Sequence, residues 1–307
     1  MHPVSRRTFA KASLATASLA ALPKTLSAKA RDSKMSYGLV TYLWGQDWDL
    51  PTLIANCEQA KCLGVELRTT HKHGVERSLS KQKRVAVRDR FADSEVTLVG
   101  IGSNERYDNP DPGVVKKAIE ATKEFVRLSH DVGSTGVKVK PDRFYPDVPR
   151  EKTIAQIGKA LNELGKYAEG FGQQIRLEVH GQCAELPTIK AIMDVADNRN
   201  VAVCWNSNKQ DLQGKGLEHN LGLVIDRFGA TCHVRELDSP DYPYQKLIDL
   251  LVAADYDGWI LLESSSKPKD RIVALAAQVR LFKKMVAQAT AFLNAALSSR
   301  SVPTFDV

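Results

Sequence analysis

The second half of the chain alternates short apolar runs with amphipathic segments, the pattern of strands followed by helices. Four apolar runs stand out, at residues 175–180, 201–206, 231–235 and 259–263. They follow one another at intervals of about 30 residues, which is the length of one strand plus one helix. Successive parallel strands connected by helices are therefore expected in this part of the chain.

The same alternation extends back to residue 37. Further strand-like runs cover residues 37–43, 65–69, 97–102 and 136–140. Helical patterns, with apolar positions three and four residues apart, cover residues 51–63, 113–132, 152–171 and 187–196. Strands alternating with helices indicate a parallel sheet, and eight is the number of strands that a closed barrel requires. We predict an α/β protein with a single domain, a (β/α)8 TIM barrel over residues 37–290.

An open doubly wound sheet is the alternative to the barrel. Its ligands bind at a switch point in the strand order instead of on four consecutive strands. No Gly-x-Gly-x-x-Gly motif follows the first predicted strand, where Gly38 and Gly45 are too far apart. A dinucleotide site is therefore not expected.

The first 30 residues have the features of an export signal. Residues 5–11 read Ser-Arg-Arg-Thr-Phe-Ala-Lys, a twin-arginine pattern, and an apolar run and an Ala28-Lys-Ala30 cleavage candidate follow. The apolar run, residues 12–22, is shorter than the about 20 residues that span a bilayer, so no stable membrane anchor is expected. We predict a twin-arginine signal at 1–30, a linker at 31–36, a C-terminal tail at 291–307, and a periplasmic or otherwise exported protein.

The net charge of the chain depends on this signal. The whole chain carries +7, but residues 1–30 contain five basic residues and no acidic one, so the rest carries 38 basic against 36 acidic residues. A nucleic-acid surface would need clustered basic charge on the mature domain. We therefore expect no nucleic-acid partner.

Each of the four runs carries a polar residue at or near its C-terminal end. These residues are Glu178, Asn206, His233 and Glu263. Because the C-terminal ends of barrel strands converge on one mouth, four residues far apart in sequence become neighbours. Carboxylate, amide and imidazole groups suit a hard or borderline divalent cation. Taken singly, a glutamate could pair with a base and His233 could be a core residue, so the predicted metal site depends on their joint occurrence.

Other polar and aromatic residues fall near the same strand ends. His180 and Arg235 lie two residues beyond a predicted ligand and so share its face of the strand, and Lys140 ends another strand. We predict that these three contact the substrate. Trp44 and Trp205 are further candidates because an indole can cover an apolar face of a substrate, although core packing is as good an interpretation of Trp205. Glu185 is expected either to orient substrate or to cap a helix.

The phrases Leu-Glu-Val-His-Gly, Cys-Trp-Asn-Ser-Asn, His-Val-Arg-Glu-Leu-Asp and Trp-Ile-Leu-Leu-Glu resemble the xylose isomerase-like TIM-barrel superfamily. Within it, the chain is most similar to the sugar phosphate isomerases/epimerases, relatives of ketose 3-epimerases. The resemblance implies that Glu178 and Glu263 bind Mn²⁺, with Mg²⁺, Co²⁺ and Zn²⁺ left open, and act as acid and base on opposite faces of the sugar. It places the ligand histidine on His233. Asn206 stands where relatives usually have aspartate, and the lost charge should weaken the metal site.

Three functions are compatible with this sequence. The first is an exported, metal-dependent sugar isomerase or epimerase that acts by enediolate-type proton transfer on a ketose or ketosugar derivative. The second is a metal-dependent lyase or dehydratase acting on 3-keto-glycosides or inososes with the same groups. The third, suggested by Asn206, is a sugar-binding barrel without catalysis. In each case the partner is a small carbohydrate, and a homo-oligomer is left open.

Overall fold

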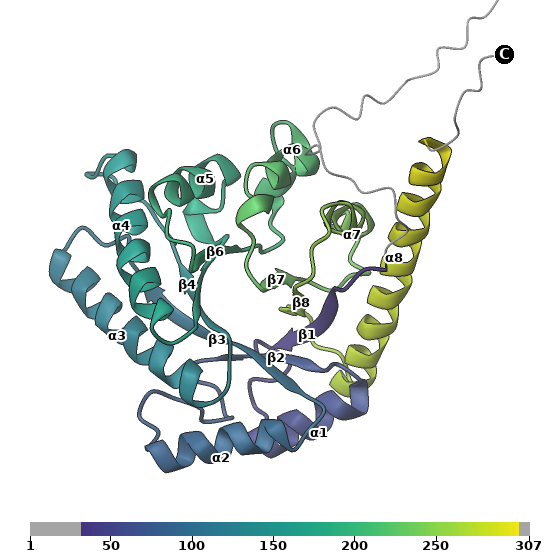
Figure 1. Ribbon diagram of the computed structural model, residues 1–307, viewed down its shortest axis with the longest axis horizontal. Helices are drawn as coiled ribbons and strands as arrows, with labels where there is room; N and C mark the ends of the chain where they lie inside the picture. The colour runs from purple at the N-terminus through teal and green to yellow at the C-terminus, as the bar shows by residue number, and fades with distance from the viewer. Residues whose placement is uncertain (1–31, 301–307) are drawn as a thin grey trace, which may run out of the picture.

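Eight parallel strands form the centre of the molecule in the computed structural model, which describes residues 32–300 (Figure 1). The strands are β1 Ser36–Val40, β2 Gly64–Arg68, β3 Thr97–Arg106, β4 Gly136–Lys140, β5 Gln174–Glu178, β6 Val201–Cys204, β7 Thr231–Val234 and β8 Trp259–Leu262. Their order in the sheet is β6-β5-β4-β3-β2-β1-β8-β7. Isolated bridges, Asn206 with His233 and Val203 with Phe228, join the region of β6 to that of β7. The sheet is thus a nearly closed barrel, and the predicted fold is confirmed.

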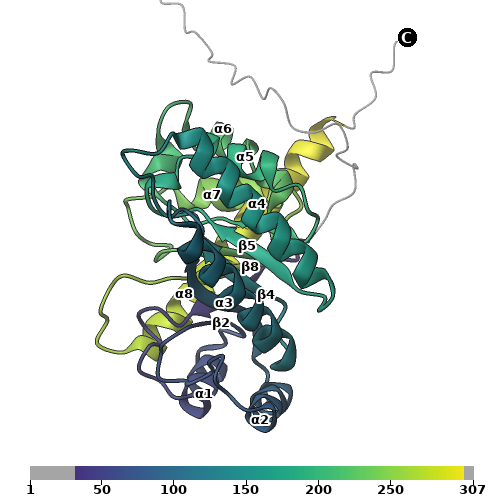
Figure 2. The same cartoon turned by 90° about the vertical axis from the view of Figure 1, so that its left-hand side faces the viewer.

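Helices connect the strands and surround the barrel (Figures 1 and 2). They are α1 Leu50–Ala60, α2 Lys81–Ala92, α3 Pro112–Asp131, α4 Arg150–Glu169, α5 Leu186–Val195, α6 Gly216–Gly222, α7 Tyr244–Ala253 and α8 Arg271–Arg300, with short 3-10 turns at Gly181–Cys183, Lys209–Leu212 and Ile225–Arg227. None of the helices in residues 32–300 combines the length and the hydropathy that a membrane crossing requires. The predicted export signal lies outside the described residues.

Two helices show how differently these elements are encoded. α3 begins after Asp111, whose side chain accepts a hydrogen bond from the Gly113 amide, and Pro112 occupies its first turn. One face of α3 buries a regular set of apolar residues, so its periodicity was sufficient to predict it. α2 buries only Val87 and Phe91 and is otherwise polar, and its periodicity does not reveal it. At the other end of the chain, α8 continues past residue 291, where the tail was predicted to begin.

The interior of the barrel contains charged side chains in addition to apolar ones. Glu66, Lys138, Arg176, Glu178 and His233 are all essentially inaccessible to solvent. Buried ionic groups require partners, because transfer of a charge from water to a protein interior is costly. The groups that each charged side chain contacts therefore distinguish those that stabilise the fold from those that belong to a functional site.

Two glycines of β3 make room for one of the buried acids. A Cβ atom at Gly100 would lie 3.0 Å from one carboxylate oxygen of Glu66, and a Cβ atom at Gly102 would lie 2.9 Å from the other. Side chains larger than hydrogen at these positions would crowd Glu66. β3 therefore admits the Glu66 carboxylate to the interior of the barrel.

Candidate metal centre

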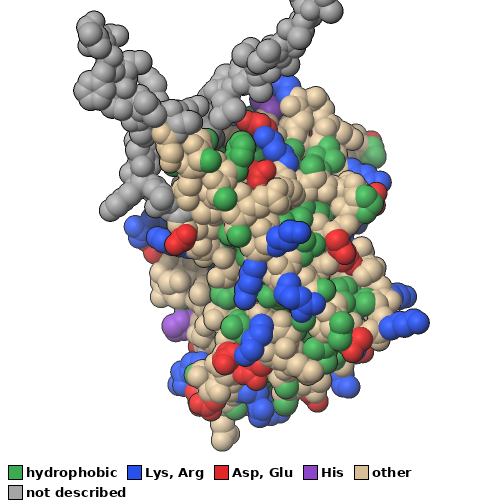
Figure 3. Space-filling model, turned by 90° about the vertical axis from the view of Figure 1, so that its right-hand side faces the viewer, with side chains coloured by type: hydrophobic (Ala, Val, Ile, Leu, Met, Phe, Trp, Pro, Cys, Tyr) green, Lys and Arg blue, Asp and Glu red, His purple; other side chains and the backbone are tan. Residues whose placement is uncertain are grey.

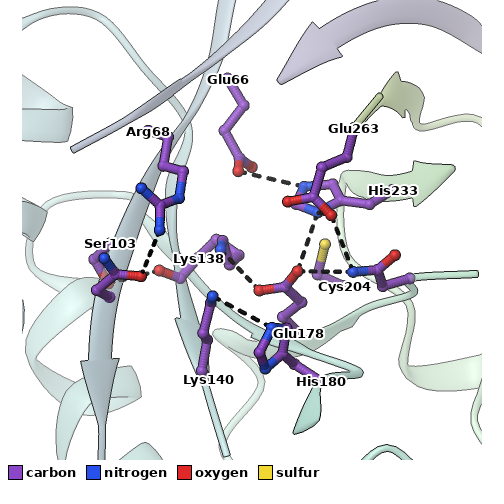
Figure 4. A network of polar contacts seen from close by, with 12 residues as sticks. Glu66, Arg68, Ser103, Lys138, Lys140, Glu178, His180, Cys204, His233 and Glu263 are labelled. Carbon is purple, nitrogen blue, oxygen red and sulfur yellow. Dashed lines mark hydrogen bonds and ion pairs between the residues drawn. The ribbon is translucent and has the colours of Figure 1, made fainter. Parts of the chain in front are cut away.

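Three predicted ligands meet at the mouth of the barrel (Figure 4). Glu178 is the last residue of β5, His233 lies within β7, and Glu263 directly follows β8. One ligand atom from each residue lies within 4.8 Å of the other two. Glu178 and His233 are inaccessible to solvent, and the Glu263 side chain retains 12% exposure. The three residues can therefore hold a metal ion that is accessible from one side.

Asn206 lies between the two glutamates. Its amide nitrogen donates hydrogen bonds to Glu178 Oε1 at 2.9 Å and to Glu263 Oε2 at 3.2 Å. Its Oδ1 atom is buried and accepts no hydrogen bond from the described residues. Rotation of the amide by half a turn would exchange the nitrogen and the oxygen. The predicted fourth ligand thus adjoins the carboxylates but turns its nitrogen toward them.

His233 is enclosed by carboxylates from both sides of the barrel. Its Nε2 atom lies 3.3 Å from Glu66 Oε1, and its Nδ1 atom lies 3.4 Å from Glu178 Oε1. These distances allow charge attraction, although neither nitrogen forms a hydrogen bond of good geometry among the described residues. Burial opposes protonation, but Cys204, Glu66 and Glu178 raise the pKa of His233 well above its ordinary value. If Glu66 accepts a hydrogen bond from the Nε2–H group, Nδ1 carries no proton. It can then serve as a metal ligand next to Glu178 and Glu263.

Lys138 of β4 keeps Glu178 ionised. Its ammonium nitrogen lies 2.7 Å from Glu178 Oε2, with both side chains almost completely buried. Burial alone would raise the pKa of Glu178, but Lys138, followed by His233, brings it well below its ordinary value. Glu178 is therefore a carboxylate in the folded protein, whether or not a cation is bound.

The donor set fits a divalent cation. Glu66, Glu178 and Glu263 carry three negative charges, against the two fixed positive charges of Lys138 and Arg176. Both oxygens of Glu66, the Asn206 oxygen and both His233 nitrogens are buried without a hydrogen-bond partner among the described residues. Buried polar atoms in native proteins rarely lack partners. Oxygen ligands with one imidazole suit Mn²⁺, Mg²⁺ or a similar ion.

A chain of polar contacts reaches the mouth from the side of β4. Asp142 lies 2.8 Å from Arg106 and accepts a 2.7 Å hydrogen bond from His180 Nδ1. The other ring nitrogen of His180 then faces the Lys140 ammonium at 3.4 Å. The hydrogen bond from His180 is the largest cause of the lowered pKa of Asp142. The predicted substrate contacts His180 and Lys140 are thus neighbours, and Asp142 orients them.

Among the remaining predicted contacts, Arg235 and Trp44 lie at the mouth. Arg235 donates to the backbone oxygen of Glu263 at 3.4 Å, and the Trp44 indole donates to the backbone oxygen of Ser266 at 3.0 Å. Trp44 is only 3% exposed, because the segment after β8 covers it. Its indole therefore supports that segment.

Two predicted substrate contacts require correction. Trp205 is completely buried and packs on Phe228 with ring centroids 5.7 Å apart. It neighbours the inward-facing Asn206, so its own side chain points outward to the helix layer. Glu185 has a side chain that is 58% exposed and pairs with Arg150 at 3.6 Å on the surface. Neither residue reaches the metal centre.

Three residues of this mouth escaped the sequence prediction. Glu66 and Lys138 lie within strands, and Arg68 ends β2, whereas the prediction considered only the ends of other strands. A signal was available in Gly64-Val-Glu-Leu-Arg68 and Gly136-Val-Lys-Val-Lys140, where charged residues alternate with apolar ones. Alternation on a strand enclosed by helices indicates polar groups that face the barrel interior.

A cavity of about 850 Å³ lies away from this chemistry, between α8 and the N-terminal ends of β1 and β3. Met35, Phe282 and Val286 line it, and it contains none of the predicted ligands. Active sites of (β/α)8 barrels lie at the C-terminal ends of the strands. The mouth is therefore the better candidate.

Comparison with known proteins supports this assignment of the fold. The sequence profile described as "Xylose isomerase-like TIM barrel" matches residues 54–208, just over half of the chain. No curated protein sequence matches. Among solved structures, an L-ribulose 3-epimerase is 16% identical with a TM-score of 0.73, covering 87% of this chain and 99% of its own.

Two further solved structures show the same likeness. A 3-keto-D-glucoside 4-epimerase from E. coli is 12% identical with a TM-score of 0.69, covering 82% of this chain and all of its own. A D-allulose 3-epimerase from Methylomonas sp. is 19% identical with a TM-score of 0.67, covering 84% of this chain and all of its own. At such identities the likeness establishes the fold alone.

Proposed function

Because the chain belongs to the xylose isomerase-like TIM barrel family, we propose that it is a metal-dependent epimerase or isomerase of a ketose or ketosugar derivative. The observation that carries this proposal is the cluster of Glu178, His233 and Glu263 at the mouth of the barrel. Carboxylates and an imidazole in this arrangement offer both a metal site and proton-transfer groups. The structural neighbours named above are sugar epimerases, which is consistent with such a reaction.

In this proposal Glu178, His233 and Glu263 hold the cation, and Asn206 adds its Oδ1 atom after rotation of the amide. Mn²⁺ is the proposed ion, while Mg²⁺, Co²⁺ and Zn²⁺ suit the same donors. A bound divalent cation would polarise the substrate carbonyl and stabilise negative charge on its oxygen. Glu66 would hold His233 in the orientation and tautomer that this site needs.

Proton transfer is assigned to the two glutamates. A proton is removed from the carbon beside the ketone at one carboxylate and returned to the opposite face from the other, which inverts that carbon. General acid and base groups contribute roughly 10²- to 10⁴-fold when their geometry is correct. Lys138 is paired with Glu178 and reduces its basicity, whereas Glu263 forms no ion pair with a lysine or arginine among the described residues. We therefore assign the first proton abstraction to Glu263.

Export is proposed from residues 5–30 alone, which lie outside the described residues. Replacing the twin arginines, with Arg6→Lys and Arg7→Lys combined, should retain the protein in the cytoplasm of a host that has the twin-arginine pathway. Cell fractionation measures this directly. Unchanged periplasmic recovery of the double variant would argue against this route.

The reaction is tested by deuterium incorporation from D₂O into a panel of ketoses and 3-keto-glycosides. Incorporation into a product of unchanged composition is the expected result, and Glu263→Gln should abolish it. Loss of a leaving group would identify a lyase that uses the same groups. Binding of sugars without exchange of substrate protons, in a protein loaded with Mn²⁺, would contradict the proposal and favour a non-catalytic barrel.

A further inference from the structure

The side of the mouth formed by β2 and β4 carries positive charge that the protein does not neutralise. Arg68 ends β2 and Lys140 ends β4, and Figure 4 shows both side chains directed toward the space near Glu66 and Glu178. Among residues 32–300, neither forms an ion pair with a carboxylate. Arg68 donates to Asn104 Oδ1 at 3.1 Å, and Lys140 faces only the His180 ring nitrogen at 3.4 Å.

Other sheltered cations of this molecule have either an acidic partner or, like Arg176, a full set of neutral acceptors. The Arg84 side chain, 14% exposed, lies 2.9 Å from Asp131, and the Lys123 side chain, 18% exposed, lies 2.8 Å from Glu120. Lys140 is only 7% exposed and has none. An ammonium group withdrawn from water without a counter-charge costs free energy. Its retention at the mouth indicates that it serves a ligand.

Lys140 is also held in place. The series of contacts from Arg106 through Asp142 and His180 ends at the Lys140 ammonium. Burial, followed by repulsion from Lys138 and Arg68, lowers the pKa of Lys140, and the attraction of Glu178 and Glu263 only partly offsets this. An anion placed between Arg68 and Lys140 would relieve that repulsion.

The charge of the metal centre does not account for these two cations. Glu66, Glu178 and Glu263 carry three negative charges, and Lys138, Arg176 and one divalent ion together supply four positive ones. Arg68 and Lys140 then remain as surplus positive charge beside the substrate. A neutral sugar would offer both cations hydroxyl groups and no counter-charge.

We propose that the substrate is a ketose that carries a carboxylate, and that Arg68 and Lys140 bind this carboxylate. The inference rests on the proposed function, whose substrate it specifies. The planar guanidinium group of Arg68 matches the two oxygens of a carboxylate, and Lys140 adds a point charge from the neighbouring side. A phosphate is the less suitable anion because both side chains arise from strand ends, without the helix N-terminus that commonly binds phosphate.

Three hexoses that differ only at carbon 6 test this inference. They are D-fructose, D-fructuronate and D-fructose 6-phosphate, which present a hydroxyl, a carboxylate and a phosphate. Binding to the Mn²⁺-loaded protein is measured by calorimetry at one ionic strength, and deuterium exchange is followed on the same samples. We expect D-fructuronate to bind at least about tenfold more tightly than D-fructose, since hydrogen bonds to charged groups are the stronger ones.

Variants assign the preference to the two cations. Lys140→Met and Arg68→Gln should each reduce the ratio of fructuronate to fructose affinity toward one, and Lys140→Arg should retain part of it. The matched control is Lys166→Met, an exposed lysine in the last turn of α4, for which the ratio should equal that of the wild type. Circular dichroism of each variant shows whether the fold is retained.

The outcomes separate the inference from the proposed function. Equal affinity for D-fructose and D-fructuronate would overturn the inference, even where exchange shows that the enzyme is an epimerase. Equal or tighter binding of D-fructose 6-phosphate would overturn the choice of carboxylate. Absence of exchange with all three sugars would count against the proposed function, and the binding ratios would still decide the inference.

Discussion

Arg176 and Glu66 both lie next to Gly100 in the barrel, but their polar atoms have different surroundings. A Cβ atom at Gly100 would lie 3.0 Å from Glu66 and 3.1 Å from Arg176. The nitrogens of Arg176 donate to Gln174 Oε1 at 2.8 Å, to the Val99 carbonyl at 2.7 Å and to Thr135 Oγ1 at 2.7 Å. Neither oxygen of Glu66 accepts a hydrogen bond from the described residues.

This difference separates a structural layer from a functional one. Arg176 is a buried charge whose hydrogen-bonding groups are matched by the strands around it, so it needs nothing from outside the chain. Toward the mouth, Glu66, Asn206 and His233 retain unmatched polar atoms, and each such atom costs about 1–3 kcal/mol. Folding tolerates this cost where a ligand later compensates it. Substitutions in the two layers should therefore affect different properties.

The largest effect is expected at Lys138 and Glu178, the one matched ion pair that the functional layer contains among the described residues. Glu178→Gln removes the partner of Lys138 and leaves a buried ammonium, which should lower the free energy of unfolding by about 3–5 kcal/mol. Glu263→Gln, at a partly exposed position without such a pair, should cost less than about 1 kcal/mol. Urea denaturation in the presence of a chelator measures both. Equal losses would mean that Lys138 and Glu178 are not a specific pair.

Arg176→Met should lower stability and leave metal binding intact. It removes three hydrogen bonds, although Val99 and Gln174 each keep one other donor, at an expected cost of about 1–3 kcal/mol. Glu66→Gln should instead weaken metal affinity about 10- to 100-fold, because Glu66 supports the ligand His233. If Arg176→Met instead releases the metal while stability is unchanged, the separation into two layers is wrong.

Asn206→Asp tests whether residue 206 is a metal ligand. In the wild type the Asn206 amide donates to Glu178 and Glu263, and a carboxylate in its place would repel both. We expect a lower melting temperature without metal and a larger increase in melting temperature on addition of Mn²⁺ than in the wild type. Thermal melts with and without Mn²⁺ give both values. A Mn²⁺-induced increase no larger than that of the wild type would place residue 206 outside the ligand set.

The smallest effect concerns Asp211, a buried acid that is only partly matched. Its Oδ2 atom accepts hydrogen bonds from the backbone N–H of Asn208 and from the Tyr242 hydroxyl, whereas Oδ1 has no partner among the described residues. Burial raises its pKa to about 7. Between the ordinary pKa near 4 and about 7, the folded state retains a proton that the unfolded state has lost, so stability falls as pH rises through this window.

Asp211→Asn should therefore gain stability relative to the wild type as pH is raised from 5 to 8. Urea denaturation of both proteins at the two pH values measures the difference. A difference that does not vary with pH would show that Asp211 ionises normally in the folded protein.

The sequence predicts the barrel because alternation and spacing are properties of whole segments. Eight apolar runs at regular intervals leave few architectures, and the strand ends then place Glu178, His233 and Glu263 together. The polar helix α2 has no such periodicity, since only Val87 and Phe91 of it are buried. Its capping residue, Ser80, is a weaker signal than a periodic apolar face.

The site is predicted less completely, for reasons that concern side chains. Glu66 reaches His233 from across the barrel because Gly100 and Gly102 leave space for it, and a single strand does not reveal this contact. The orientation of the Asn206 amide depends on its neighbours and not on its position in a strand. Trp205 was predicted at the mouth because it is close to a strand end. Successive side chains of a strand alternate in direction, so the residue before the inward-facing Asn206 points outward and is buried there.

The central claim is that the unmatched groups of the mouth hold one divalent cation. Titration of the metal-free protein with Mn²⁺, in wild type and in His233→Ala, tests it most directly. We expect one ion per chain in the wild type and at least about 100-fold weaker binding in the variant, since a ligand is lost and not merely its supporting partner. Equal Mn²⁺ binding by the two proteins, or no binding by the correctly folded wild type, would contradict the account.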